Sequence, residues 1–187
     1  MPSTVYFSRT KLQNGRDFGE KYIEESFANA GFTVIYPETL TLEQQFLILK
    51  NCKVFASTEG SISHNVMFCQ DGVQSIIVRK TRSLNGYQFS SLSIRNSDSV
   101  WIDAHLSLFK IFDGSYGPFF LYVNDNLSRY FDSIGMKVSA KFPLGMFIRY
   151  ILRSVWLSLR YRQRIRLIGD SDYYCTRLRQ EVGFRKR

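Results

Sequence analysis

The chain has 187 residues, of which 44% are hydrophobic and 16% aromatic, and this composition suits one folded domain with an appendage and excludes a disordered protein. It holds 25 Lys+Arg and 16 Asp+Glu, of which 12 and 3 lie in residues 141–187, so the whole net charge of +9 belongs to the C-terminal part. We therefore predict a neutral domain over residues 1–140 followed by a basic tail over residues 141–187.

The chain alternates short apolar runs with segments whose apolar residues recur at helical spacing. Thr41 and Gln44 have the spacing of a capping box, and Asn124 suits a helix N-cap. The pattern predicts strands at residues 5–7, 32–36, 54–57, 75–79 and 100–102, and helices at residues 17–30, 41–51, 62–69 and 124–131. Strands that alternate with helices through short connections favour a parallel sheet, so we predict an α/β, Rossmann-like fold.

The cysteines and histidines are few and scattered. Cys52, Cys69 and Cys175 have no CxxC spacing and leave one thiol over after any pairing, which indicates reduced thiols in a reducing compartment. With only His64 and His105 as further soft ligands, no zinc site is expected. The first residues lack the apolar run of a signal peptide, so we predict a cytoplasmic protein.

Polar residues follow two of the predicted strands. Ser8 and Arg9 come after the first, and a Gly-containing turn at residues 59–65 comes after the third and before a helix. The carboxyl ends of parallel strands open to one crevice, and backbone N–H groups at a helix start bind phosphate. A guanidinium such as that of Arg9 offers paired donors to a diphosphate. We therefore predict a phosphate-bearing ligand, in the first place a nucleotide-sugar.

The predicted donor-binding residues lie after these two strands. They are Arg9, Arg16, Gly60, Ser61, Ser63, His64 and Asn65. Each has an alternative without a ligand. Arg9 could form a surface ion pair, and Arg16 could be a loop charge. The Gly60 turn could be an ordinary turn capped by serine, and His64 could be structural.

Two carboxylates are candidates for a general base, Glu59 before the turn and Asp103 after the fifth strand. The alternative for Glu59 is an acid favoured by a helix N-terminus. No metal is expected, since arginines and a helix dipole can neutralise the leaving diphosphate. Asp170-Ser171-Asp172 resembles a metal-binding DxD motif but follows an Arg-rich segment, so we interpret it as a loop.

The tail combines apolar and basic residues over 142–168. Arginines within the apolar run argue against a membrane-spanning helix, which needs about 20 mainly apolar residues. An interfacial amphipathic helix, with Trp156 and arginines on anionic lipid, fits better. A helix packed back on the domain and a nucleic-acid-binding arm are the alternatives, the latter without a recognisable module.

Taken together, these motifs resemble the C-terminal half of family 61 glycosyltransferases, which include capsular-polysaccharide biosynthesis enzymes. The resemblance covers roughly residues 4–105. It is carried by Ser8-Arg9 with Arg16, by GFTVIYPETLTLEQQ at residues 31–45, and by the EGSISHN turn at residues 59–65.

The resemblance implies a two-domain GT-B fold, a nucleotide-sugar bound by the C-terminal domain, and inversion at the anomeric carbon. The positions that match the family pattern are Arg9, Arg16, Gln45, Gly60 and Asn65. Glu59 stands where the family has His, Ser61 where it has Ala, and Gly19 where it has Asn. The family's N-terminal acceptor domain is also missing, which suggests a truncated product, a split half or a fragment.

We therefore expect a glycosyltransferase of capsular or other cell-surface polysaccharide synthesis, peripheral to the cytoplasmic face of the plasma membrane. Its partners would be a nucleotide-sugar, a glycan or lipid-linked acceptor, an anionic membrane surface and an acceptor-domain chain, with no nucleic acid. The alternatives are a non-catalytic nucleotide-sugar-binding module and a membrane-surface interaction protein that acts through its tail.

Overall fold

The computed structural model describes residues 1–12, 16–82, 86–108, 117–138 and 142–160. Its centre is a five-stranded, wholly parallel sheet in the order β3-β1-β4-β5-β6. The strands are β1 (Thr4–Phe7), β3 (Thr33–Ile35), β4 (Val54–Thr58), β5 (Gln74–Arg79) and β6 (Asp98–Asp103). Numbered along the chain this order is 2-1-3-4-5, one of the two common doubly wound orders. The predicted Rossmann-like α/β fold is confirmed.

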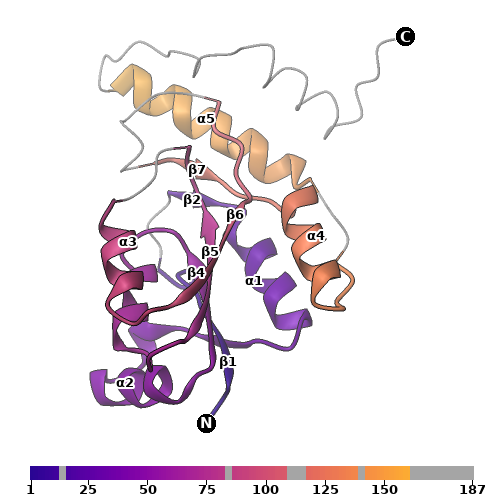
Figure 1. The fold of residues 1–187 in the computed structure, drawn as a ribbon. Helices are drawn as coiled ribbons and strands as arrows, with labels where there is room; N and C mark the ends of the chain where they lie inside the picture. The colour runs from indigo at the N-terminus through magenta and orange to yellow at the C-terminus, as the bar shows by residue number, and fades with distance from the viewer. Residues whose placement is uncertain (13–15, 83–85, 109–116, 139–141, 161–187) are drawn as a thin grey trace.

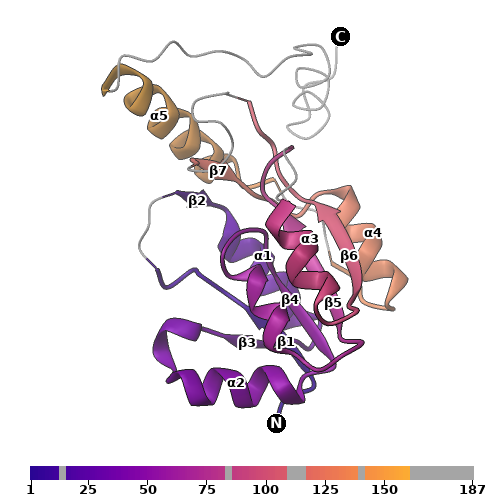
Figure 2. The same cartoon turned by 60° about the vertical axis from the view of Figure 1, so that its left-hand side comes forward.

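Helices cover both faces of the sheet, as Figures 1 and 2 show. Helices α1 (Glu20–Asn29) and α4 (Asp125–Ser133) lie on one face. Helices α2 (Leu42–Asn51) and α3 (Gly86–Ser93), with the 3-10 helix η2 (Ser63–Phe68), lie on the other.

Strand β1 contributes side chains to two hydrophobic clusters, one on each face of the sheet. Successive strand residues point to opposite faces, so Tyr6 packs with Phe27 of α1, whereas Val5 and Phe7 pack in the cluster that holds Leu49 of α2. All three β1 side chains are fully buried. Burial on both faces explains why the strands read as continuous apolar runs and not as alternating ones.

A second, smaller sheet lies beyond the carboxyl ends of the main strands. It pairs β2 (Asp17–Phe18) with β7 (Phe119–Phe120). Helix α5 (Leu144–Arg160) packs on it through a cluster that includes Phe120, Tyr122 and Tyr150. One face of α5 is thus packed on the rest of the protein, which was the alternative to a purely interfacial helix. Whether residues 141–187 form a unit separate from residues 1–140 stays a prediction.

Two predicted caps are confirmed. The Thr41 hydroxyl accepts a hydrogen bond from the Gln44 N–H at 3.3 Å, and the Gln44 side chain accepts from the Thr41 N–H at 2.9 Å. Asn124 caps α4 by accepting from the Leu127 N–H at 3.1 Å. Both motifs are local, which is why the sequence predicts them well.

The structure corrects two predictions for individual elements and refines a third. The helix predicted at 17–30 begins only at Glu20, because Asp17–Phe18 forms β2 with a partner far along the chain. The helix predicted at 62–69 is a 3-10 helix, Ser63–Phe68. No helix was predicted between residues 81 and 99, where α3 lies. The predicted Asp170-Ser171-Asp172 loop and Cys175 lie outside the described residues.

Candidate functional site at the switch point of the sheet

The chain leaves β1 toward β3 on one side and later returns to β4 on the other side of β1. In doubly wound sheets, ligands bind at the carboxyl ends of the strands where the order reverses in this way. The segments that follow β1, β4 and β5 here are residues 8–10, residues 59–65 and Lys80. We call these three segments the switch-point edge.

The loop after β1 is tied to helix α1 by Glu24. The Ser8 and Thr10 hydroxyls both donate to one oxygen of this carboxylate, and the Tyr36 hydroxyl donates to the other at 3.0 Å. Arg9 lies between Ser8 and Thr10 and is half-buried. The hydrogen bonds therefore fix the backbone from which the Arg9 side chain extends.

Glu20 joins this loop to the end of β4. Its carboxylate accepts a hydrogen bond from the Thr58 hydroxyl at 3.1 Å and another from the Arg9 N–H. The side chain is buried, and burial raises the pKa of Glu20; the neighbouring Asp17 raises it further, while the Lys80 ammonium and the two hydrogen bonds oppose the shift. Glu20 thus sits directly beneath the two segments that were predicted to bind the donor.

An ion pair connects β2 to the end of β5. The Lys80 Nζ lies 3.0 Å from Asp17 Oδ1, and the two side chains are only 7% and 5% exposed. The same ammonium lies 5.0 Å from the centre of the Phe119 ring. A Cβ added to Gly60 would lie 3.8 Å from Lys80 Nζ, so the ammonium borders the start of the predicted donor turn.

Glu59 closes the ends of β4 and β5. Its N–H donates to the Val78 carbonyl at 2.8 Å, and its carboxylate accepts from the Lys80 N–H at 3.4 Å. The residue is buried. Glu59, a predicted general base, therefore lies next to the turn, but one of its carboxylate oxygens already accepts the hydrogen bond from the Lys80 N–H.

The turn after Glu59 separates residues with internal roles from residues that face outward. Ser63 is buried; its hydroxyl donates to the Gly60 carbonyl at 2.6 Å and contacts the side chain of Gln88 on α3. Gly60 has φ of +131°, a conformation that suits glycine. Ser61, by contrast, is exposed.

The later part of the turn runs into the six-residue 3-10 helix η2. Asn65 donates to the Ile62 carbonyl at 3.0 Å. His64 is half-buried, and burial lowers the pKa of its imidazole. Few peptide dipoles add up in so short a helix, so the predicted phosphate binding depends more on Arg9 and on individual N–H groups.

Asp103 lies apart from this group. It is the last residue of β6, and β6 lies two strands away from β4 in the sheet. Two strand spacings correspond to about 10 Å. Its carboxylate pairs with Arg79 at 2.8 Å and lies 3.9 Å from His105 Nδ1. The side chain is half-exposed. Arg16 is exposed just before β2, where its carbonyl accepts from the Phe119 N–H at 2.7 Å.

Sequence reasoning missed four buried residues at or beside this edge: Tyr6, Asp17, Glu20 and Lys80. Lys80 directly follows a predicted strand, so the strand-end argument applied to Arg9 would have found it. The Tyr6 hydroxyl is buried and has no hydrogen-bond partner in the described part of the chain. Burial raises its pKa, and Glu20 adds to the shift. Among the described residues, no group of three or more His, Cys, Asp or Glu side chains is placed to hold a metal ion.

The glycosyltransferase 61 family model matches residues 1–77. The match spans 77 of the 187 residues and shows what this segment is similar to, glycosyltransferase family 61. It begins before β1, ends within β5, and includes the loop with Arg9 and the turn at residues 59–65. The resemblance inferred from the motifs is confirmed for this part of the chain, while Lys80, Asp103 and α5 lie beyond the match. Searches of curated proteins and of solved structures returned no significant match.

Proposed function

We propose that this protein is a glycosyltransferase whose nucleotide-sugar donor binds at the switch-point edge. The observation that carries the proposal is that the family 61 segment supplies both the Arg9 loop and the Gly60 turn, and that Glu20 ties the two together by hydrogen bonds. Similarity to this family implies a sugar donor and an acceptor in general. The switch point is where doubly wound sheets bind such ligands.

In the proposed complex, the diphosphate lies against the Gly60–Asn65 turn with the Arg9 guanidinium across it. Gly60 has no side chain to keep the phosphate from the backbone. Arg9 donates two parallel hydrogen bonds, and the Lys80 ammonium beside Gly60 adds positive potential. These groups stabilise the charge that develops on the departing diphosphate, so the protein needs no metal for this role. Ser61, His64 and Asn65 are the further proposed donor contacts.

The proposed reaction is an in-line displacement with inversion. An acceptor hydroxyl oxygen forms a bond to the anomeric carbon, the bond from that carbon to the diphosphate oxygen breaks, and the hydroxyl proton passes to a carboxylate. Glu59 and Asp103 are the two proposed bases. Glu59 adjoins the turn but is buried, whereas Asp103 is half-exposed but paired with Arg79.

The resemblance to capsule-synthesis enzymes supports a role in cell-surface polysaccharide assembly at the cytoplasmic face of the plasma membrane. The acceptor would be a glycan or a lipid-linked saccharide, bound with the help of an acceptor-domain partner. No nucleic acid takes part in this scheme.

The test is calorimetry of the chain with UDP, GDP and CMP and their sugar conjugates, with and without EDTA. We expect one nucleotide class to bind, with unchanged affinity when EDTA is present. Absence of heat with every nucleotide would contradict donor binding, and complete loss with EDTA would contradict a metal-independent site.

A non-catalytic nucleotide-sugar-binding module is the second candidate. The pairing of both proposed bases, Glu59 with a backbone N–H and Asp103 with Arg79, favours it. Nucleotide binding without any sugar transfer or donor hydrolysis, in the presence of acceptor glycans and the acceptor-domain partner, would identify this function.

A further inference from the structure

Helix α5 is held in place by one face only. That face packs on the small sheet: Tyr150 is 2% exposed, and its ring lies 5.7 Å from the centre of the Phe120 ring. The Tyr150 hydroxyl also accepts a hydrogen bond from the Leu108 N–H at 3.3 Å. Ser154, one turn further, is fully buried. These contacts fix which side of the helix faces away from the protein.

The side that faces away carries large apolar residues. They recur at intervals of three and four residues, which places them on one strip of the helix surface. They are Leu144, Ile148, Leu152, Trp156 and Leu159, with exposed fractions of 50%, 51%, 64%, 42% and 74%. We call these five residues the outer stripe. A helix of a water-exposed domain normally carries polar residues on this side.

Arginines border the outer stripe. Arg149, Arg153 and Arg160 lie on α5, and the helix has no acidic residue. The guanidinium carbons of Arg153 and Arg160 lie 4.5 Å and 5.0 Å from the centre of the Trp156 ring. Apolar side chains next to tryptophan and arginine are typical of helices that lie in a membrane interface.

We propose that the outer stripe of α5 docks on an anionic lipid bilayer surface. The five apolar side chains enter the boundary between headgroups and acyl chains, and the three arginines bind anionic headgroups. Charge favours lipid as the occupant, because residues 141–187 hold 12 of the 25 Lys+Arg but only 3 of the 16 Asp+Glu. Among the described residues, none of the helices has the length and apolarity of a membrane-spanning segment.

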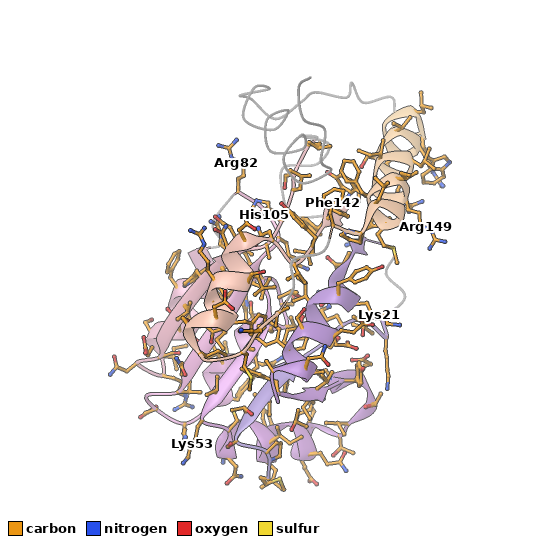
Figure 3. All side chains as sticks on the ribbon, turned by 90° about the vertical axis from the view of Figure 1, so that its right-hand side faces the viewer. Lys21, Lys53, Arg82, His105, Phe142 and Arg149 are labelled. Atoms are coloured by element: carbon orange, nitrogen blue, oxygen red, sulfur yellow. The ribbon has the colours of Figure 1, made fainter. Side chains whose placement is uncertain are left out.

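The position of α5 gives this docking a consequence. Figure 3 shows Lys53, which precedes β4, at one end of the molecule, and His105 and Arg82 at the other. Helix α5 lies at the end with His105, above the carboxyl ends of the strands, and Arg149 points away from the sheet. Docking would therefore bring the switch-point edge toward the lipid. At this position the site could take its acceptor from the bilayer. This inference about the acceptor rests on the proposed function, whereas the inference that α5 docks on lipid does not.

The test is co-sedimentation of the full chain with phosphatidylcholine vesicles and with vesicles that also contain phosphatidylglycerol. We expect binding to the anionic vesicles only, weakened by salt. Ile148→Glu with Leu152→Glu should lower the partition coefficient by about 100-fold or more, because two apolar side chains no longer leave water. Arg149→Gln with Arg153→Gln should lower it about 25-fold, at about fivefold for each arginine.

Leu42→Glu is the matched control, since Leu42 is 69% exposed on α2, away from α5. It should leave binding unchanged, and circular dichroism should show that every variant folds. Equal binding by the wild type and the stripe variant would overturn the proposal and assign lipid binding to residues 161–187. A wild-type dimer that the stripe variant loses, without vesicle binding, would identify a second copy as the occupant. Failure of nucleotide binding would leave the docking result unaffected.

Discussion

The switch-point edge and the outer face of α5 differ from ordinary core and surface in opposite ways: the edge buries charged side chains, and α5 exposes apolar ones. At the edge, Asp17, Glu20 and Lys80 are charged residues inside the protein; on α5, leucines and Trp156 lie at the surface. Burying a charge costs free energy unless the charge is paired. A strip of exposed apolar side chains lacks the favourable free energy that removal from water would give. Asp17 and Lys80 offset this cost through their ion pair, whereas the five residues of the outer stripe remain 42–74% exposed.

The largest expected effect tests whether the buried charges depend on one another. Lys80→Met leaves the Asp17 carboxylate buried without its ion-pair partner, so we expect a loss of about 3–5 kcal/mol in the free energy of unfolding. Urea unfolding followed by circular dichroism measures this. The double variant Asp17→Asn with Lys80→Met should be clearly more stable than Lys80→Met. A single variant as stable as the wild type would show that the pair does not hold the edge together.

The second prediction concerns the ligand side of the edge. Arg9→Ala should weaken nucleotide binding by about 1.5–3 kcal/mol, because a hydrogen bond to a charged group is lost. Arg16→Ala, a change at an exposed residue, should weaken it by less than about 1 kcal/mol. Calorimetry with the nucleotide that binds the wild type gives both values. Equal losses in two folded variants would show that the phosphate lies elsewhere.

The third prediction uses the raised pKa of Glu20. A carboxyl whose pKa is higher in the folded state binds more protons folded than unfolded, so its contribution to stability falls as pH rises from the unfolded value of about 4.3 through the folded value. We expect a loss of about 1.4 kcal/mol for each unit by which the pKa is raised.

Glu20→Gln removes that titration but keeps an oxygen that accepts hydrogen bonds from Thr58 and Arg9. Urea unfolding across this pH range should therefore show a fall for the wild type relative to the variant. Parallel pH profiles for the two proteins would contradict a raised pKa of Glu20 in the folded state.

The last prediction separates two serines of the same turn, and its Ser61 arm has the smallest expected effect on stability. Ser61→Ala, at an exposed position, should weaken nucleotide binding by about 1 kcal/mol and change stability by less than about 0.5 kcal/mol. Ser63→Ala removes the buried hydroxyl that binds Gly60 and Gln88, so it should cost about 1–3 kcal/mol of stability. Thermal unfolding measures the stability of both variants, and calorimetry measures their nucleotide affinity. A larger loss of stability for Ser61→Ala than for Ser63→Ala would contradict the structural role of Ser63.

Much of the fold could be predicted because its signals are local. The capping box at Thr41 and the cap at Asn124 depend on residues three positions apart, and each main strand is a short apolar run. The placement of Arg9 and Gly60 at strand ends followed from the same runs. The 3-10 character of η2 was not predicted, and the contact of its buried Ser63 with Gln88 joins residues 25 positions apart.

The sequence by itself determined the parallel α/β class, the strand-end position of Arg9 and the Gly60 turn, and the concentration of charge in the tail, because periodicity, capping and composition are properties of neighbouring residues. Tertiary structure alone decided which charges are buried. Asp17 and Lys80 lie 63 positions apart in the chain, and only the folded structure brings the strand with Asp17 to the residue that follows β5. It also decided that α5 has one packed face and one exposed apolar stripe, since a helix that is apolar on both sides carries no local sign of which side its own domain will cover.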